Sequence, residues 1–292
     1  MPNTANPTDC HATKSSVGFL FWNLQQRDRS DLVAQLVAER DVDIVIIAEG
    51  KAVRETMVEK LWRVDPGFYE PIPGIGKLLC YIRTEAMAFR ELFRDDSGRL
   101  AICSLNLFSQ EFLLAVVHLV SKAEHDVDDQ SAEAQILSER IRLSEETRPN
   151  PHQRTIALGD FNMNPFETGM TKASGFHGMM SRCSVKNGSR VVQSREYGFF
   201  YNPMWSFLGD LSPGPAGTLH HKRSGHQVSY DWNMFDQVLF RRDVLPWFQN
   251  DIEIVTRIGN NELTDEHGRP DPNVGSDHFP IYFRLQENST RG

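Results

Sequence analysis

Eight polar residues stand in or beside the ends of segments that the sequence predicts to be β-strands. Their carboxylates, amides and imidazoles are groups that bind cations, orient water and move protons. The eight residues are Asn23, Glu49, His118, Asp160, Asn162, Asp236, Asp277 and His278. This shared placement is what a convergent catalytic site requires, because strand ends bring together side chains from distant parts of a chain.

Taken singly, these residues also have structural explanations. Asn23 could cap a turn, His118 could be a hydrogen-bonded core histidine, and residues 160–162 could form an Asx-turn. The joint pattern is much harder to attribute to structural roles alone.

The strands that would position these residues are short and apolar. Residues 43–49 form a β-branched run that ends in a carboxylate, which is typical of a strand covered on both faces. Residues 155–160 repeat this design. Further strands are expected at 17–23, 78–82, 100–108, 112–120, 234–240, 252–258 and 280–284.

Helices are fewer. One is expected from the N-cap signal at Ser30 to Arg40, and a second over residues 126–146. Residues 175–230 are irregular and predict long loops with short strands. Because strands outnumber helices, we expect an α+β fold of two packed sheets flanked by helices.

No linker divides the chain. We therefore expect one domain at 17–286, between a flexible tail at 1–16 and a C-terminal tail at 287–292.

Composition narrows the class of protein. The 292 residues carry 31 Lys+Arg against 39 Asp+Glu, a net charge of −8, and 40% are hydrophobic. This is typical of a globular protein and argues against a wholly basic nucleic-acid coat, although a metal site could attract phosphate locally. No apolar run approaches the roughly 20 residues of a membrane helix, and the polar start lacks a signal-peptide pattern. Four scattered cysteines favour reduced thiols and a cytoplasmic location.

Six sequence blocks, in order, resemble the endonuclease/exonuclease/phosphatase superfamily. They are Phe21-Trp22-Asn23, residues 43–49, Val117-His118-Leu119, Gly159-Asp160-Phe161-Asn162, Phe235-Asp236-Gln237-Val238 and Gly275-Ser276-Asp277-His278-Phe279-Pro280. GDFN or SDH alone is moderately specific, whereas six ordered blocks over residues 17–285 are a strong signature. The resemblance implies a four-layer α/β/β/α sandwich of two mixed sheets.

The same resemblance implies phosphodiester hydrolysis that depends on Mg²⁺ or Mn²⁺ and proceeds by in-line attack of water. It implies that Glu49 is the principal metal ligand, with contributions from Asn23 and Asp277. Asp160 would orient or deprotonate the water, and Asn162 would hold the phosphate or the nucleophile in line.

By the same resemblance, His278 would contact the phosphoryl group and Asp236 would steer its imidazole. His118 places the chain with the deoxyribonuclease-like, sphingomyelinase-like and phosphatase-like branches, because abasic-site endonucleases lack that histidine. The chain departs from the family pattern at two positions, where Ala48 precedes the glutamate and Gln25 follows Trp-Asn. These departures leave the number of metals open.

Residues 186–226 combine aromatic side chains with five Lys or Arg and two acids, a local charge of 5 − 2 = +3. We expect Tyr201, Trp205, Lys222 and Arg223 to bind substrate, with rings that stack bases beside a backbone groove. The alternative is that the rings fill a sheet and the cations are solvated.

Three functions compete. The first is a nuclease acting on DNA or RNA, the second a phosphoesterase acting on a small phosphorylated molecule or lipid headgroup, and the third an inactive interaction domain. We rank them in this order, because the sequence shows neither dense Lys and Arg around the catalytic blocks nor a hydrophobic membrane-facing element.

Overall fold

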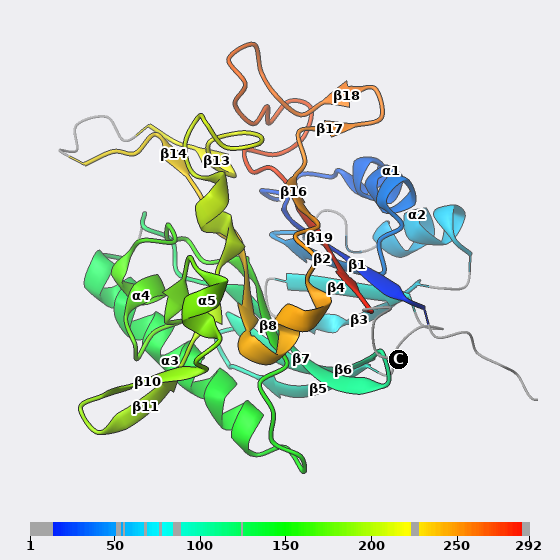
Figure 1. Cartoon of the computed structure of the whole chain (residues 1–292). Helices are drawn as coiled ribbons and strands as arrows, with labels where there is room; N and C mark the ends of the chain where they lie inside the picture. Colours follow the sequence, from blue (N-terminus) through cyan, green and yellow to red (C-terminus); the bar gives the residue numbers. More distant parts are fainter. Residues whose placement is uncertain are drawn as a thin grey trace, which may run out of the picture.

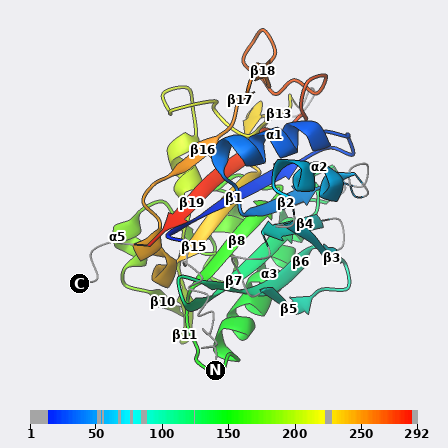
Figure 2. The same ribbon diagram turned by 90° about the vertical axis from the view of Figure 1, so that its right-hand side faces the viewer.

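The structure is a computed structural model that describes residues 14–50, 54, 56–66, 69–75, 78–83, 89–123, 125–222 and 228–287, with the backbone alone for 69–75. Two mixed sheets lie at its centre, one of six strands and one of seven. Helices α1 (Ser30–Arg40) and α2 (Met57–Val64) cover the outer face of the first sheet, and α3 (Val127–Glu146) covers that of the second (Figures 1 and 2). The expected four-layer sandwich is confirmed.

The six-stranded sheet is antiparallel except for one central pair. Its strands, in spatial order, are β16 (Ile252–Ile254), β19 (Ile281–Gln286), β1 (Ser16–Asn23), β2 (Ile44–Ala48), β4 (Leu78–Arg83) and β3 (Tyr69–Ile75). The parallel pair is β1 with β2, so both strands end at the same edge, where Asn23 lies opposite Ala48.

The seven-stranded sheet has a similar parallel pair. Its strands, in spatial order, are β5 (Phe89–Arg94), β6 (Leu100–Leu107), β7 (Gln110–His118), β8 (Thr155–Asp160), β15 (Asp236–Arg241), β12 (Phe200–Tyr201) and β9 (Gly178–Met179). β7 and β8 run parallel with His118 opposite Asp160, and β15 starts with Asp236 opposite the same aspartate. Register alone therefore brings three predicted catalytic residues into adjacent positions.

Short elements fill the long irregular region and decorate the sandwich. They are α4 (Thr168–Thr171), α5 (Arg182–Val185), η3 (Pro203–Phe207), η4 (Arg242–Trp247), and the ribbons β10 (Ser189–Val192) with β11 (Arg195–Gly198), β13 (Leu219–His220) with β14 (Trp232–Asn233), and β17 (Arg257–Ile258) with β18 (Asn261–Glu262).

Alternation along β7 shows why the chain folds as stacked layers. Phe112, Leu114 and Val116 belong to the core between the sheets, whereas Leu113 and the alternate residues after it belong to the core under α3. Successive side chains of a strand point to opposite faces, and both faces of this strand are apolar and buried. The strand is therefore fixed between two hydrophobic layers.

Helix α3 confirms the expected span and its start signal. Asp126 accepts a hydrogen bond from the backbone N–H of Asp129, whose side chain accepts one from the backbone of Asp126 in return. This capping box satisfies N–H groups that the first turn leaves without helical partners.

Other expectations need correction or lie outside the described residues. The expected strand at 252–258 is two strands, because Val255 bonds to Pro280 and the chain then leaves the sheet to form β17. Cys80, Cys103 and Cys183 are free thiols, and most of both predicted tails falls outside the described residues. In the described part of the chain, no helix has the length and apolar character to cross a bilayer.

Candidate active site

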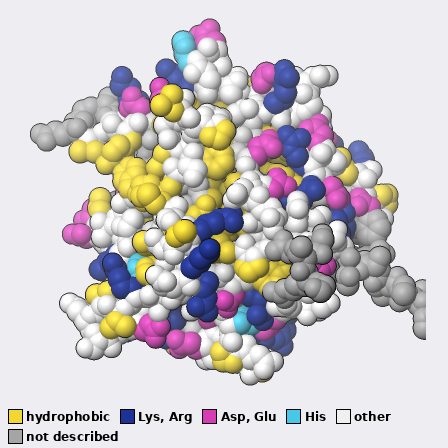
Figure 3. Space-filling model, in the orientation of Figure 1, with side chains coloured by type: hydrophobic (Ala, Val, Ile, Leu, Met, Phe, Trp, Pro, Cys, Tyr) yellow, Lys and Arg dark blue, Asp and Glu magenta, His cyan; other side chains and the backbone are white. Residues whose placement is uncertain are grey.

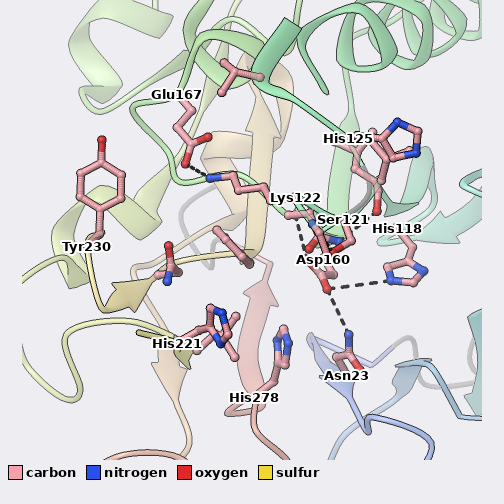
Figure 4. Close-up of a pocket in the computed structure, with 18 of the residues that line it drawn as sticks. Asn23, His118, Ser121, Lys122, His125, Asp160, Glu167, His221, Tyr230 and His278 are labelled. Carbon is pink, nitrogen blue, oxygen red and sulfur yellow. Dashed lines mark hydrogen bonds and ion pairs between the residues drawn. The ribbon is translucent and has the colours of Figure 1, made fainter. Parts of the chain in front are cut away.

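The carboxyl ends of four strands meet at one end of the sandwich. Asn23 ends β1, Glu49 follows β2, His118 ends β7 and Asp160 ends β8. All four residues line a cleft of about 1160 Å³ (Figure 4). Both parallel pairs therefore deliver their polar termini to the same cavity, as the sequence predicts.

Asn23 connects the two acids of this group. Its amide nitrogen donates to Glu49 Oε1 at 3.4 Å and to Asp160 Oδ2 at 3.0 Å. His118 Nε2 lies 3.6 Å from the same Glu49 oxygen and 3.9 Å from the same Asp160 oxygen. The interaction with His118 lowers the pKa of the half-buried Glu49 more than burial raises it, so this carboxylate is held ionised.

Local backbone geometry aims these groups. Glu49 has φ = +50° and Asn162 has φ = +49°, in the left-handed region that asparagine tolerates better than most residues. At Gly159 a Cβ would lie 1.8 Å from the carbonyl oxygen of Val117, so this position admits only glycine. The glycine of the GDFN block is therefore required for packing, whereas its aspartate and asparagine are the residues predicted to do chemistry.

Asn162 holds Asp160 in place. Its backbone N–H donates to Asp160 Oδ1 at 2.8 Å, and its side-chain amide nitrogen donates to the carbonyl oxygen of Leu119 at 2.9 Å. Both bonds are buried and tie the segment after β8 to the end of β7. The alternative of an Asx-turn and the predicted catalytic role are therefore compatible, since the turn fixes the carboxylate.

Asp236, at the start of β15, and His278, three residues before β19, form a buried pair. His278 Nδ1 lies 2.8 Å from Asp236 Oδ2, and the carbonyl oxygen of His278 accepts a bond from Trp22 Nε1 at 2.9 Å. Burial would lower the pKa of His278, but the charge and hydrogen bond of Asp236 and the charges of Asp160 and Asp277 together raise it. Burial also raises the pKa of Asp236, which the charge of His278 opposes. Because His278 lines the cleft, its ring offers a cationic edge there.

Asp277 lies at the rim of this group rather than at its centre. Gln25 Nε2 donates to Asp277 Oδ2 at 2.6 Å, and Ser276 Oγ donates to the other oxygen at 3.2 Å. Gln25, the residue that departs from the family pattern, is therefore a direct partner of a predicted metal ligand. Ligand atoms of Asp160, Asp236 and His278 lie within 4.8 Å of one another, a grouping that includes neither Asp277 nor Glu49.

The donor set fits a hard divalent cation. In the described part of the chain, the ion pairs of Glu49 and Asp160 are both with His118. Two carboxylates that share one histidine leave negative charge at the end of the cleft, and carboxylate oxygens are the ligands that Mg²⁺ and Mn²⁺ prefer. The residues present therefore suit the expected metal.

The predicted substrate residues do not line the cleft among the described residues. Tyr201 is buried in the core between the sheets, which corrects the expectation that its ring stacks a base. Trp205 is half-buried and its ring lies 6.3 Å from that of Phe166. Lys222 is exposed outside the cleft, and Arg223 lies outside the described residues. The alternative that these rings serve packing therefore holds for Tyr201.

Polar residues that the sequence did not single out also shape the cleft. Lys122 pairs with Glu167, and Asn164 bonds to both Glu167 and Asn233. Asn164 was recognisable, since it stands two residues after the GDFN block. The other three belong to no motif, and their proximity depends on how the loops return to the sheet.

The chain forms a sandwich of two mixed sheets, and a cleft lined by carboxylates and histidines lies at the strand ends. These two features together define a class of protein. The model of the Endonuclease/Exonuclease/phosphatase family matches residues 20–278, and the chain belongs to this family. No curated protein sequence matches the chain.

Solved structures share the fold at low sequence identity. Truncated Caenorhabditis elegans TDP2 is 18% identical with a TM-score of 0.55, over 93% of this chain and 98% of that chain. D. rerio TDP2, solved with a single-strand DNA product, is 14% identical with a TM-score of 0.53, over 94% and 100%. The endonuclease domain of TRAS1, a telomere-specific non-LTR retrotransposon, is 16% identical with a TM-score of 0.50, over 92% and 98%.

Proposed function

We propose that this protein is a nuclease that hydrolyses phosphodiester bonds with the help of Mg²⁺ or Mn²⁺. The observation that carries the proposal is the convergence of Glu49, Asp160, His118 and the Asp236–His278 pair on one cleft. Acids that bind a cation and position water, opposite an imidazolium, are the groups that phosphodiester hydrolysis needs.

Glu49 would hold the cation, and Asn23 would fix the carboxylate of Glu49. Asp160 or Asp277 would contribute a further oxygen ligand at the edge of the metal site. When bound, the cation supplies positive charge to the phosphoryl oxygens and lowers the barrier to attack. Asn23 also keeps Asp160 close to Glu49, because its one amide nitrogen reaches both carboxylates.

Asp160 would orient the attacking water and accept its proton through Oδ2, the oxygen that lies beside Asn23 and His118. The bond from the backbone N–H of Asn162 keeps the other oxygen fixed, which lowers the cost of aligning the water. Because Asp236 raises the pKa of His278, this ring would hold a proton on the edge opposite Asp236 and donate a hydrogen bond to the phosphoryl group. Such positioned groups are typically worth a hundred-fold or more in rate.

A nucleic acid is the substrate we favour over a small phosphate ester. The cleft, at about 1160 Å³, slightly exceeds the roughly 300–1,000 Å³ of pockets for single small molecules, so it has room for a nucleotide unit. Two structures with the same fold support this choice, because one carries a single-strand DNA product and the other is an endonuclease domain.

The proposal is tested by hydrolysis assays on labelled single-stranded DNA, duplex DNA, RNA and small phosphodiesters. Activity should require Mg²⁺ or Mn²⁺, and EDTA should abolish it. Glu49→Gln should weaken metal binding and reduce activity, whereas Glu262→Gln, an exposed residue of β18, should change neither. Activity in EDTA, or unchanged metal affinity in Glu49→Gln, would exclude the assignment, and hydrolysis of small phosphodiesters alone would favour the phosphoesterase.

A further inference from the structure

Two exposed aromatic rings line the same cleft as the catalytic groups. Phe166 is 38% exposed and Tyr230 is 54% exposed, and their ring centroids lie 5.1 Å apart at an interplanar angle of 72°. Val228, also in the cleft wall, is 62% exposed. In the view of Figure 3, hydrophobic side chains gather around the β13–β14 ribbon. Large apolar side chains exposed together mark a binding surface more often than chance placement.

Polar bonds connect the segments that carry the two rings. Phe166 lies between Asn164 and Glu167, and Tyr230 lies three residues before Asn233. Asn164 Nδ2 donates to Glu167 Oε1 and to Asn233 Oδ1, each at 3.0 Å, and Asn164 Oδ1 accepts from the backbone of Met234 at 2.8 Å. These bonds fix one segment against the other, so the rings are preorganised for a ligand.

The same segments lead directly to the catalytic carboxylates. Phe166 follows the end of β8 by six residues, and Tyr230 precedes the start of β15 by six residues. Leu219 of the β13–β14 ribbon also bridges to His278, which anchors the ribbon at the site. Figure 4 shows Tyr230 across the cavity from Asn23 and His118. A ligand that reaches the catalytic groups can therefore contact both rings.

The charges of this cleft do not suit a long duplex backbone. Among the described residues that line it, Lys122 is paired with Glu167, and Arg99 lies 3.8 Å from Glu133. A protein that follows duplex DNA typically neutralises six to ten phosphates with Lys and Arg. Aromatic stacking, in contrast, requires a base that is not held in a duplex.

We propose that Phe166 and Tyr230 form a stacking site for an unpaired nucleobase, so that the substrate is a single-stranded nucleic acid or a single-stranded end. This inference rests on the proposed nuclease function and names its substrate class. Stacking is worth enough per base to change affinity by roughly five- to hundred-fold. Because stacking acts on substrate binding, removal of either ring should change KM more than kcat.

Binding without cleavage tests the site directly. Fluorescence anisotropy in EDTA compares a labelled single-stranded oligonucleotide with an abasic strand of the same length and with a duplex. The parent protein should bind the base-containing strand more tightly than both others. Phe166→Ala and Tyr230→Ala should each lose roughly five-fold or more on that strand and little on the abasic one, whereas Phe166→Tyr and Tyr230→Phe should retain affinity.

Val191→Ala, at an exposed position of β10, is the matched control and should leave all three affinities unchanged. Ring variants that melt normally and bind all probes like the parent would overturn the inference, as would preference for the duplex. If the protein hydrolyses DNA and the ring variants have no effect, the nuclease proposal is supported and the stacking site is excluded. If binding depends on the base but no hydrolysis occurs in Mg²⁺ or Mn²⁺, the stacking site is supported and the nuclease proposal is excluded.

Discussion

The two ends of the seven-stranded sheet hold their buried and partly buried charges in different ways. At the end away from the cleft, Glu145 pairs with Arg241 at 2.9 Å and Glu111 pairs with Arg148. At the cleft end, Asp160 and Asp236 are paired with histidines. Arg241 ends the strand that Asp236 begins, so a single strand joins the two arrangements.

The difference separates stability from chemistry. A guanidinium is always charged and makes several fixed hydrogen bonds, so an acid that faces arginine is permanently neutralised. A histidine provides one bond on one side and leaves its other nitrogen for a ligand or a proton. Asp236 Oδ1 even lacks a hydrogen-bond partner within the described residues, which a purely structural pair would not favour. The arginine pairs therefore suit a structural role, whereas the histidine pairs lie beside the cleft and suit the proposed chemistry.

The largest effect should come from breaking the pair at the arginine end. Glu145→Ala leaves Arg241, which is 4% exposed, buried without its charge partner and should lower the free energy of unfolding by about 3–5 kcal/mol. Urea denaturation measures the loss. Glu139→Ala on the same helix removes more exposed pairs with Arg142 and Arg195 and should cost less than about 1 kcal/mol. Equal losses in both variants would contradict the comparison.

The corresponding change at the histidine end should affect turnover instead. Asp236→Asn keeps the shape of the side chain but removes the charge that favours a cationic His278, so kcat should fall on the order of a hundred-fold or more. Its loss of unfolding free energy should be smaller than that of Glu145→Ala. Asp243→Asn, in η4 at the other end of the strand, is the control and should retain turnover. A folded Asp236→Asn variant with near-native kcat would remove Asp236 from the mechanism.

The sequence locates the cleft better than its walls. Each predicted catalytic residue stands in a short block in or beside a strand end, and the parallel pairs β1–β2 and β7–β8 bring those ends together. The wall residues depend on contacts that no local pattern contains. Gln25 meets Asp277 across 252 positions of sequence, and only the folded chain shows this pair.

The edges of the sheets and the environments of the aromatic residues are also hard to predict from the sequence. β3 contains Pro71 and Pro73, which argue against a strand in sequence but are tolerated at a sheet edge. Tyr201 and Tyr230 are both tyrosines of the irregular region, yet the first pairs with Phe240 of β15 and is buried. Long-range strand pairing, rather than residue type, decides which ring can meet a ligand.

A pH titration of stability sharpens the comparison at the arginine end. Partial burial would raise the pKa of Glu111, but bonds and charge from Arg148, with bonds from Ser104 and His152, lower it to about 2. A carboxylate with a depressed pKa stabilises the fold at pH values above its pKa in the unfolded state, which is near 4.5. This contribution disappears as the pH falls toward 2.

Glu111→Gln should therefore lower stability by about 1 kcal/mol at neutral pH, after allowance for solvent screening, and less as the pH falls through roughly 4.5. Thermal melts of both proteins across this range measure the difference. Glu59→Gln, in an exposed pair on α2, should show a much smaller difference at neutral pH. A difference between parent and Glu111→Gln that grows on acidification would contradict a lowered pKa for this carboxylate.

The smallest expected effect concerns Lys222 and salt. Each phosphate contact by Lys or Arg contributes about −0.7 to the slope of log affinity against log salt for a single strand. Because the described cations of the cleft are already paired with acids, the parent should show a shallow slope, roughly −1 to −2. Lys222 is exposed outside the cleft, so Lys222→Ala should change that slope by less than the roughly 0.7 that one phosphate contact contributes. The control Lys60→Ala, on α2, should change the slope no more than Lys222→Ala does. The slope is measured by anisotropy in EDTA over a salt series. A parent slope near roughly −6, flattened by more than about one unit in Lys222→Ala, would mean that the phosphate backbone follows a basic surface beside the cleft, and the stacking site would then be secondary.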